Sequence, residues 1–481
     1  MTRKALFAFS VAFCALLAAL VINTAALDSR QLESARLAPT QVGIEQAAER
    51  LSKAIQWQTV SSREEVSASA EEFRKLREHL AASFPVLHSK LTLEAVNGSL
   101  LYTWPGNDPD LLPILFAAHM DVVPADDVNW EHPPFAGKIA EGFIWGRGAI
   151  DDKSGVMAIL EAVKILLQSG FEPNRTILIA LGHDEEVGGA NGAGAIAQLL
   201  RSRGVVLESV LDEGGAVTRG ILPLEAPVAT VGIAEKGYLT LELSVETKGG
   251  HSMNPPPQTA IGTLARAIAR LEANPFPARI DGATRELFKH IGPEMPLLRR
   301  VVLANLWLFG PLVERQLQAT PSTDAAIRTT IAATIFEAGA RENVLPAKAR
   351  ATVNFRILPG DSLDHVISRV REVIDDSEVG IRVLGKAFEP SLTSSTESPA
   401  YSHLAKTIRA LFPEAVVAPY LVPGATDARH YAPLARNVYR FLPLPMTAED
   451  LARFHGVNER IALDDYRRMI QFYVQIIATS N

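Results

Sequence analysis

Imidazole and carboxylate side chains, which bind divalent cations, occur together in short motifs of this sequence. The motifs are AAHMDVVPA with His119 and Asp121, GRGAIDDKSG with Asp151, GHDEEVGG with Glu185 and Glu186, VLDEGG with Asp212, and RFHGVNE with His455. The single cysteine, Cys14, lies in the apolar N-terminal segment, so thiolate ligands are excluded from the folded body. Two histidines with several carboxylates and no sulfur favour zinc among the divalent ions.

Each motif alone also has an ordinary structural interpretation. Adjacent aspartates such as Asp151 and Asp152 commonly cap a helix. Adjacent glutamates are most often part of a solvated loop, and a lone histidine such as His455 is most often a surface or core residue. The motifs taken together favour a metal-binding or catalytic site over these interpretations, because several residues of metal-ligand type follow strand-like segments.

The segments around these motifs alternate between apolar runs typical of buried strands and the apolar spacing of amphipathic helices. Apolar runs predict strands that end near His119, Glu185 and Asp212, and amphipathic patterns predict helices over 151–170 and 193–204. Such alternation predicts an α/β domain whose mostly parallel sheet is covered on both faces. Because open α/β sheets carry their sites at the carboxyl ends of the strands, we expect these ligands along one edge.

The pattern changes after Gly237. Strand, helix and strand signals between 238 and 387 predict a small α+β domain inserted into the first domain, with an insertion of its own at 278–341. The α/β pattern resumes afterwards. We therefore expect a catalytic domain in two parts, 40–237 and 388–481, on either side of the inserted domain.

The N-terminal 30 residues predict export. Positive charge in MTRK precedes an uncharged apolar run from Ala5 to Leu27. This length lies between that of a cleaved signal peptide and that of a membrane-spanning helix, and Thr24-Ala25-Ala26 is a possible cleavage site. We expect a periplasmic, secreted or anchored protein. The net charge of −7 and the lack of a basic stripe exclude nucleic acid as a partner.

The motifs resemble those of a known family. AAHMDVVPA, GRGAIDDKSG, GHDEEVGG, LDEGG, KGGHS and HGVNE occur in the order found in the co-catalytic dizinc aminoacylase and carboxypeptidase family. The segments NLWLFGPLVERQL and FHGVNERI are similar in particular to vacuolar carboxypeptidase S (a Gly-X carboxypeptidase) and the secreted N-fatty-acyl-amino-acid synthase/hydrolase. The resemblance spans about residues 40–480. It implies a three-layer zinc-peptidase catalytic domain with an inserted ferredoxin-like lid and dimerisation domain.

The resemblance implies a role for each ligand-type residue. Asp151 would bridge two Zn²⁺ ions, which Co²⁺ or Mn²⁺ could replace. His119 and Asp212 would complete one site, and Glu186 and His455 the other. The peptide bond that follows Asp151 would be cis.

Three further residues would take part in catalysis. Asp121 would support His119, and Glu185 would be the general base. His251, in KGGHSMNPP, would stabilise the oxyanion, often in the site of a neighbouring subunit, which implies a homodimer.

Other positions match substrate-binding residues. They are Asn343 and Arg356, together with Gly424, Asp427 and Arg429 in VPGATDARHY. An arginine could hold a free α-carboxylate through two parallel hydrogen bonds. Arg356 could instead pair with an acid in its own sheet.

Four functions fit this sequence to different degrees. The first is cleavage, or reversible formation, of N-acyl amino acids with hydrophobic or fatty acyl groups, and the alternative is a Gly-X type carboxypeptidase or dipeptidase. A noncatalytic binding protein is disfavoured because all five ligands and the base are present. A deacetylase or desuccinylase of a biosynthetic intermediate is disfavoured by the export signal. Membrane association through residues 5–27 also follows from the apolar run.

Overall fold

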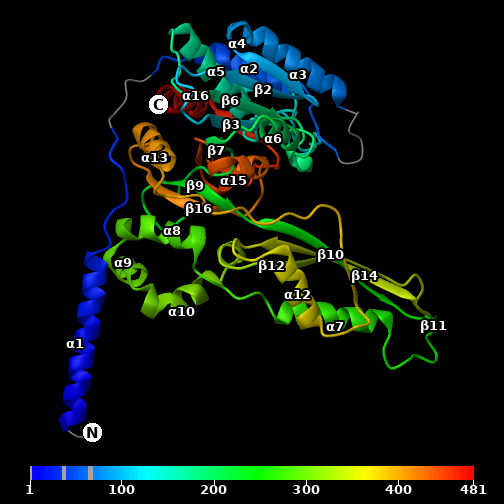
Figure 1. The fold of residues 1–481 in the computed structure, drawn as a ribbon. Coiled ribbons are helices and arrows are strands. Elements are labelled where there is room, and N and C mark those ends of the chain that lie inside the picture. The colour runs from blue at the N-terminus through cyan, green and yellow to red at the C-terminus, as the bar shows by residue number, and fades with distance from the viewer. Residues whose placement is uncertain (1–2, 35–39, 63–68, 481) are drawn as a thin grey trace.

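The computed structural model describes residues 3–34, 40–62 and 69–480. Its centre is a ten-stranded mixed sheet, and a separate four-stranded sheet lies beside it (Figure 1). The large sheet takes its strands from both ends of the chain, and the small sheet takes its strands from the middle. The α/β class with an inserted domain is confirmed, whereas the exact domain bounds stay a prediction.

The large sheet has the order β1-β2-β6-β3-β7-β17-β9-β8-β18, with β16 paired to β9. The strands are β1 (Thr92–Val96), β2 (Ser99–Trp104), β3 (Ile114–His119), β6 (Ile177–Gly182), β7 (Leu207–Asp212), β8 (Val217–Thr218), β9 (Val228–Glu235), β16 (Val416–Val422), β17 (Ala435–Arg440) and β18 (Pro445–Met446). The central strands β6, β3, β7 and β17 pair in parallel. The β1–β2 hairpin makes one edge antiparallel, so the sheet is more mixed than the sequence predicts.

Helices cover both faces of the large sheet, which gives three layers. On one face lie α2 (Ile44–Gln56), α5 (Lys153–Gln168) and α16 (Leu463–Ala478), and on the other lie α6 (Ala193–Ser202) and α14 (Ala428–Tyr431). Strand β3 is buried along its whole length because it contacts both layers. Phe116 packs in the first core, and its neighbour Leu115 packs in the second.

Further helices and a small sheet complete this domain. They are α3 (Ala70–Ser83), α4 (Pro85–Lys90), α13 (Pro399–Leu411), α15 (Ala448–Leu451) and a three-stranded sheet of β4 (Lys138–Ala140), β5 (Phe143–Trp145) and β19 (Arg460–Ala462). Helices α2, α3 and α4 precede β1 in the chain.

The small sheet forms the lid domain. Its order is β12-β14-β10-β15, from β10 (Gly237–Glu246), β12 (Thr330–Ala338), β14 (Lys348–Ile357) and β15 (Gly380–Val383). Helices α7 (Ala260–Ala273) and α12 (Leu363–Ile374) pack on it around one apolar core. With α7 after β10 and α12 after β14, the domain is ferredoxin-like, as the resemblance implies. A two-stranded antiparallel sheet, β11 (Gly250–His251) with β13 (Val344–Leu345), extends its far end (Figure 1).

The predicted insertion at 278–341 is mostly helical. It contains α8 (Gly282–Ile291), α9 (Leu297–Ala304), α10 (Leu306–Leu317) and α11 (Pro321–Ala325). Strand β12, which the sequence analysis missed, belongs to the lid sheet. Leu287 and Ile291 of α8 pack on Val416 and Val228 of the large sheet, so part of this segment lies against the catalytic domain.

A single residue separates the two sheets. Strand β9 of the large sheet ends at Glu235, and β10 of the lid begins at Gly237. The intervening Lys236 is buried, and its Nζ donates hydrogen bonds to the backbone oxygens of Ala325 and Arg328. The lid therefore joins the catalytic domain through a short, buried connection.

Candidate active site

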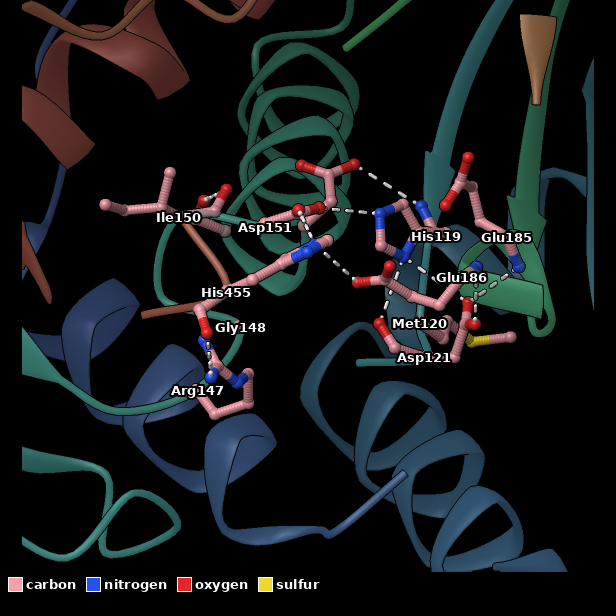
Figure 2. Close-up of polar contacts among 12 residues, drawn as sticks. His119, Met120, Asp121, Arg147, Gly148, Ile150, Asp151, Glu185, Glu186 and His455 are labelled. Atoms are coloured by element: carbon pink, nitrogen blue, oxygen red, sulfur yellow. Dashed lines mark hydrogen bonds and ion pairs between the residues drawn. The ribbon is translucent and has the colours of Figure 1, made fainter. Parts of the chain in front are cut away.

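The carboxyl end of β3 delivers the first histidine of the site. His119 is buried, and its Nδ1 lies 3.0 Å from the backbone oxygen of Asp121 and 3.3 Å from the Asp121 carboxylate. This contact orients the ring, so that Nε2 faces Asp151 at 2.8 Å (Figure 2). A carboxylate that fixes one nitrogen of a histidine leaves the other nitrogen free to bind a metal.

Asp151 lies between two histidines. One carboxylate oxygen is 2.8 Å from Nε2 of His119, and the other is 3.1 Å from Nε2 of His455 (Figure 2). Asp151 precedes α5, and its peptide bond to Asp152 is cis, as the resemblance implies. A carboxylate with one oxygen toward each histidine has the arrangement that a ligand shared by two cations needs.

The two adjacent glutamates lie in one turn of 3₁₀ helix, Glu185–Val187, directly after β6. The buried carboxylate of Asp121 accepts a hydrogen bond from the backbone N–H of Glu185 and another from that of Glu186, each at 3.1 Å. Asp121 therefore holds this turn and His119 together. Glu186 Oε1 lies 3.3 Å from Nε2 of His455.

Three of these side chains form a cluster with metal-site dimensions. Ligand atoms of His119, Asp151 and Glu186 all lie within 4.8 Å of one another. Asp212, at the end of β7, is outside this cluster of three. It is buried, and one of its carboxylate oxygens accepts a hydrogen bond from the backbone N–H of Ala428 at 2.7 Å.

Several buried carboxylates lie close together around the cluster, so their negative charges repel one another. Burial raises the pKa of Glu185 well above its usual value; the charge of His119 acts to lower this pKa, and the charges of Asp427, Glu186 and Asp121 act to raise it. Burial likewise raises the pKa of Asp212.

The pKa values of His119 and His455 are raised, whereas burial alone lowers the pKa of a histidine. Burial favours a lower pKa for His119, but its contacts with Asp121 and Asp151 raise the pKa well above 6.5. Hydrogen bonds to Asp151 and Glu186 raise the pKa of His455 to about 10. Carboxylates that destabilise one another and hold protons on histidines form a site that cations would stabilise.

A cavity of about 880 Å³ opens over this cluster, between the catalytic domain and the lid. Its acidic wall includes Asp151, Glu185, Glu186 and Glu213. The lid and its connection contribute Tyr238, Arg356, Leu384 and Phe388, and the segment after β16 contributes Gly424 and Arg429.

Cations and aromatic rings alternate along one wall of the cavity. The guanidinium of Arg356 lies 4.9 Å from the centre of the Tyr238 ring, which stacks on Phe388 at 5.8 Å. Arg429 lies 4.6 Å from the Phe388 ring and also donates a hydrogen bond to the backbone oxygen of Gly188. Arg356 has no ion pair with any residue in 3–34, 40–62 or 69–480, so the alternative of an acid partner in its own sheet is not observed.

Asp427 does not line the cavity wall. It is buried, and its carboxylate lies beneath the turn that carries the adjacent glutamates, where a Cβ on Gly189 would be 1.9 Å from Oδ1. Gly189 has a φ of 60°, so both its conformation and the close carboxylate favour glycine. Neither oxygen of Asp427 has a hydrogen-bond partner among the described residues.

Comparison with known proteins identifies the family of this chain. The profile of peptidase family M20/M25/M40 matches residues 115–479. The chain belongs to the M20 peptidase family. It is 43% identical over 474 residues to the probable carboxypeptidase S-like 2 of Dictyostelium discoideum, which covers 95% of this chain and 91% of the relative. It is 41% identical over 486 residues to the N-fatty-acyl-amino acid synthase/hydrolase PM20D1 of Xenopus tropicalis, which covers 98% of this chain and 94% of that relative.

The fold agrees with this assignment. The crystal structure of an M20 family metallo-carboxypeptidase from Sulfolobus solfataricus matches with a TM-score of 0.66 and 21% identity, over 90% of this chain and 98% of that one. This M20 protein is therefore a hydrolytic enzyme that acts on amide bonds. The His119, Asp151 and Glu186 cluster is its candidate zinc-type metal site.

Two predicted residues of this M20 enzyme lie far from the metal cluster. His251 is exposed on the two-stranded β11–β13 sheet, at the far end of the lid domain (Figure 1). Asn343 is next to it, and its backbone oxygen accepts a hydrogen bond from the N–H of Ser252 at 3.1 Å. Within one chain, the structure does not bring either residue to the cavity.

The sequence analysis missed a buried ion pair that organises the site. Glu459 and Arg147 are both buried, and Arg147 Nη1 lies 2.6 Å from Glu459 Oε2. Arg147 also donates a hydrogen bond to the backbone oxygen of His455 at 3.0 Å. Glu459 lies in the motif RFHGVNE and Arg147 in the motif GRGAIDDKSG. The available signal was therefore that each of these motifs carries a charged residue to which the sequence analysis assigned no role.

Proposed function

We propose that this enzyme is a dizinc-dependent amidohydrolase that cleaves, or reversibly forms, the amide bond of N-acyl amino acids with hydrophobic or fatty acyl groups. The observation that carries the proposal is Asp151, which faces both histidines beside a cavity that Glu185 also lines. The similarity to a protein named N-fatty-acyl-amino acid synthase/hydrolase supports the substrate class.

Five side chains would hold two cations. Asp151 would be shared, with His119 and Asp212 on one side and Glu186 and His455 on the other. The nitrogen and oxygen donors fit zinc, and the excess of buried carboxylates fits a doubly charged ion. When bound, divalent cations would lower the pKa of a water and polarise the amide carbonyl.

The chain's own groups would then handle protons and substrate. Glu185 would take a proton from the attacking water and deliver it to the leaving nitrogen. Burial raises the pKa of Glu185 above its usual value, which makes its carboxylate a stronger base. Asp121 would fix Glu185 through the backbone N–H bond at 3.1 Å.

Substrate selection would use the alternating wall of the cavity. Arg356 would bind the α-carboxylate, with Gly424 and Arg429 close by in the same cavity. Tyr238 and Phe388 would contact apolar parts of the substrate. A cavity of about 880 Å³ is within the usual range for sites that enclose most of a small ligand.

A dimer would complete the site. We propose that His251, with Asn343 beside it, reaches the cavity of a second copy and donates a hydrogen bond to the developing oxyanion. Their place at the far, exposed end of the lid supports this arrangement, because a lid end can project into a neighbouring molecule.

The alternative is a Gly-X type carboxypeptidase that acts on short peptides. Similarity to the probable carboxypeptidase S-like 2 supports it, and the same arginine would bind the C-terminal carboxylate. In both cases we propose an exported enzyme, since Arg3–Ala25 is long and apolar enough to serve as a signal or an anchor.

The first experiment compares three substrates with purified, zinc-loaded full-length enzyme. They are an N-oleoyl amino acid, the N-acetyl derivative of the same amino acid, and a Gly-X dipeptide. We expect the highest kcat/KM for the oleoyl compound. A preference for the dipeptide would establish the alternative, and equal rates on the two acyl lengths would reject a fatty acyl preference.

Variants test the residue roles in the same preparation. Glu185→Gln should lower kcat by about 10²–10⁴-fold while the bound zinc is unchanged. Glu208→Gln, at the surface ion pair with Arg436, is the control and should keep full activity. Asp151→Asn should reduce zinc content at both sites, whereas Asp212→Asn should reduce it at one. Equal zinc loss in these last two variants would contradict the proposed sharing by Asp151.

A further inference from the structure

Helices α9 and α10 expose an apolar face that the amidohydrolase site does not use. Neither helix has a buried residue, although together they span Leu297–Leu317 with one intervening residue. The exposed fractions are 69% for Leu297, 82% for Leu298, 60% for Trp307 and 62% for Leu312. An exposed apolar face on a globular protein marks a surface that contacts another protein or a membrane.

The C-terminal end of the N-terminal helix α1 (Arg3–Ala25) packs against α9, beside this face. Asn305, which connects α9 to α10, is fully buried. Its Oδ1 accepts a hydrogen bond from the side chain of Asn23 at 2.9 Å, and its Nδ2 donates to the backbone oxygen of Leu20. Figure 1 shows α9 beside the C-terminal end of α1, and α10 on the side of the body from which α1 projects.

The segment after α1 is attached to the body by further hydrogen bonds. Arg300 of α9 donates to the backbone oxygen of Leu27 at 2.8 Å. The side chain of Gln31 both donates to and accepts from the backbone of Val417, a residue of the large sheet. These bonds place the C-terminal end of α1 at a fixed position on the catalytic domain.

Helix α1 has the properties of a membrane-spanning segment. It has 23 residues, and it is the helix of the described chain that is long and apolar enough to cross a bilayer. Its apolar side chains are exposed, with Phe7 at 73% and Val21 at 67%. Arg3 and Lys4 lie at its N-terminus, which by the positive-inside rule stays in the cytoplasm while the body is exported.

We propose that α1 is retained as a membrane anchor and that the exposed face of α9 and α10 rests on the outer leaflet of the same phospholipid bilayer. Because the anchor contacts Asn305, a bilayer around α1 necessarily comes close to both helices. Trp307 would lie at the level of the headgroups, where an indole can keep its ring in an apolar environment while its N–H is satisfied. In the structure this N–H donates to Oδ1 of Asn305 at 3.2 Å.

The contacts between α1 and Asn305 favour a retained anchor over a cleaved signal. Removal of α1 would take Leu20, Asn23 and Thr24 away from Asn305 and leave it its hydrogen bonds with Val301 and Trp307. A bilayer contact at this face goes beyond the proposed amidohydrolase function and does not depend on it.

The test uses full-length protein reconstituted into vesicles of phosphatidylcholine and phosphatidylglycerol. The lipid acyl chains carry bromine either close to the headgroup or near the bilayer centre, and tryptophan fluorescence is recorded. We expect stronger quenching by the shallow bromine, and we expect Trp307→Phe to remove this difference. Trp57→Phe, which changes a tryptophan of the catalytic domain, should keep it. The intact mass of protein purified from membranes should include residues 1–27.

Defined results would overturn the proposal. If Trp307→Phe leaves the quenching unchanged, the face does not touch lipid. If the native chain is recovered in the soluble fraction with a new N-terminus near residue 27, α1 is a cleaved signal.

A triple variant, Leu298→Glu with Trp307→Glu and Leu312→Glu, tests a second copy as the occupant. Conversion of a detergent-solubilised dimer to a monomer, without lipid quenching of wild type, would establish a protein interface instead. Leu392→Glu, at a 92% exposed leucine elsewhere, is its control.

Discussion

The carboxylate of Glu459 accepts a hydrogen bond from the backbone N–H of Asp151 at 3.1 Å, although the two residues are 308 positions apart. The same oxygen accepts from the N–H groups of Gly148 at 3.0 Å and Ile150 at 2.7 Å. Through Arg147, Glu459 also reaches the backbone of His455. One buried side chain therefore holds two distant segments of the proposed metal site in register.

Glu459→Gln should destabilise both the fold and the metal site. Gln keeps the shape but removes the charge, so the buried Arg147 loses its counter-ion. Breaking a buried ion pair in this way costs about 3 kcal/mol. We expect a loss of that size in the free energy of unfolding measured with urea, together with a lower zinc content after dialysis.

Glu94→Gln is the matched control for this prediction. Glu94 pairs with Arg203 at a much more exposed position, where an ion pair contributes about 0–1 kcal/mol. If the Glu459 and Glu94 variants lose equal stability, burial of the first pair does not matter. If Glu459→Gln retains full zinc, the pair has no role in arranging the ligands.

Arg356→Met should raise KM for substrates with a free α-carboxylate by about 10–100-fold, because a hydrogen bond to a charged group contributes about 1.5–3 kcal/mol. The change in kcat should be small, since Arg356 lies on the lid side of the cavity, away from the metal cluster. Steady-state kinetics on an N-acyl amino acid and on its carboxamide measure this effect.

The carboxamide is the internal control for Arg356. It lacks the charge, so wild type and Arg356→Met should turn it over at similar rates. Arg356→Lys should recover part of the affinity, because it keeps the charge but not the paired hydrogen-bond geometry. An equal loss on both substrates would mean that Arg356 acts by supporting Tyr238 rather than by binding the carboxylate.

A mixture of His251→Ala and Glu185→Gln chains should regain activity if His251 acts in a partner's site. Each variant alone should be nearly inactive. After unfolding and refolding together in equal amounts, half of the dimers would be mixed, and each mixed dimer would have one site with both wild-type residues. The expected activity is therefore about a quarter of wild type.

The control mixture combines Asp121→Asn with Glu185→Gln. These two residues belong to the same chain's site, as their 3.1 Å contact requires, so no mixed dimer has an intact site. Recovery in this control would mean that the assay detects something other than shared sites. Absence of recovery with His251→Ala would place His251 outside the partner's site.

His403 should make the fold less stable in mild acid. Burial, assisted by the charges of Arg175 and Lys406, lowers its pKa from 6.5 to about 4. Between these values the unfolded chain binds a proton that the folded chain does not bind, so the free energy of unfolding falls as pH decreases from 6.5 to 4. Urea unfolding at several pH values should show a smaller decrease for His403→Gln. An unchanged slope would mean that His403 remains accessible to protons in the fold.

The sequence indicates the proposed ligands of this site more directly than it indicates the residues that support them. His119, Glu186 and Asp212 follow strands whose apolar runs are local signals, and parallel strands bring their ends to one edge. The bond between Glu459 and Asp151 depends on the whole chain between them, and no local pattern encodes it.

Two differences between the predicted and the observed structure have the same origin. Strand β12 has a largely exposed burial pattern, so it lacks the apolar and polar alternation by which β10 is recognised. Asp427 lies in a glycine-rich turn that resembles a carboxylate-binding loop, but tertiary packing directs its side chain beneath Gly189. In both cases the deciding contacts come from segments far away in the sequence.

The position of β17 in the large sheet determines when this enzyme can mature. Strand β17 lies between β7 and β9, so the sheet stays divided until residues 435–440 have been made. His455 is made later still, after the entire lid. A nascent chain therefore lacks the proposed ligand His455 until the lid has been made, and an exported chain would acquire its metal from the compartment in which it finishes folding.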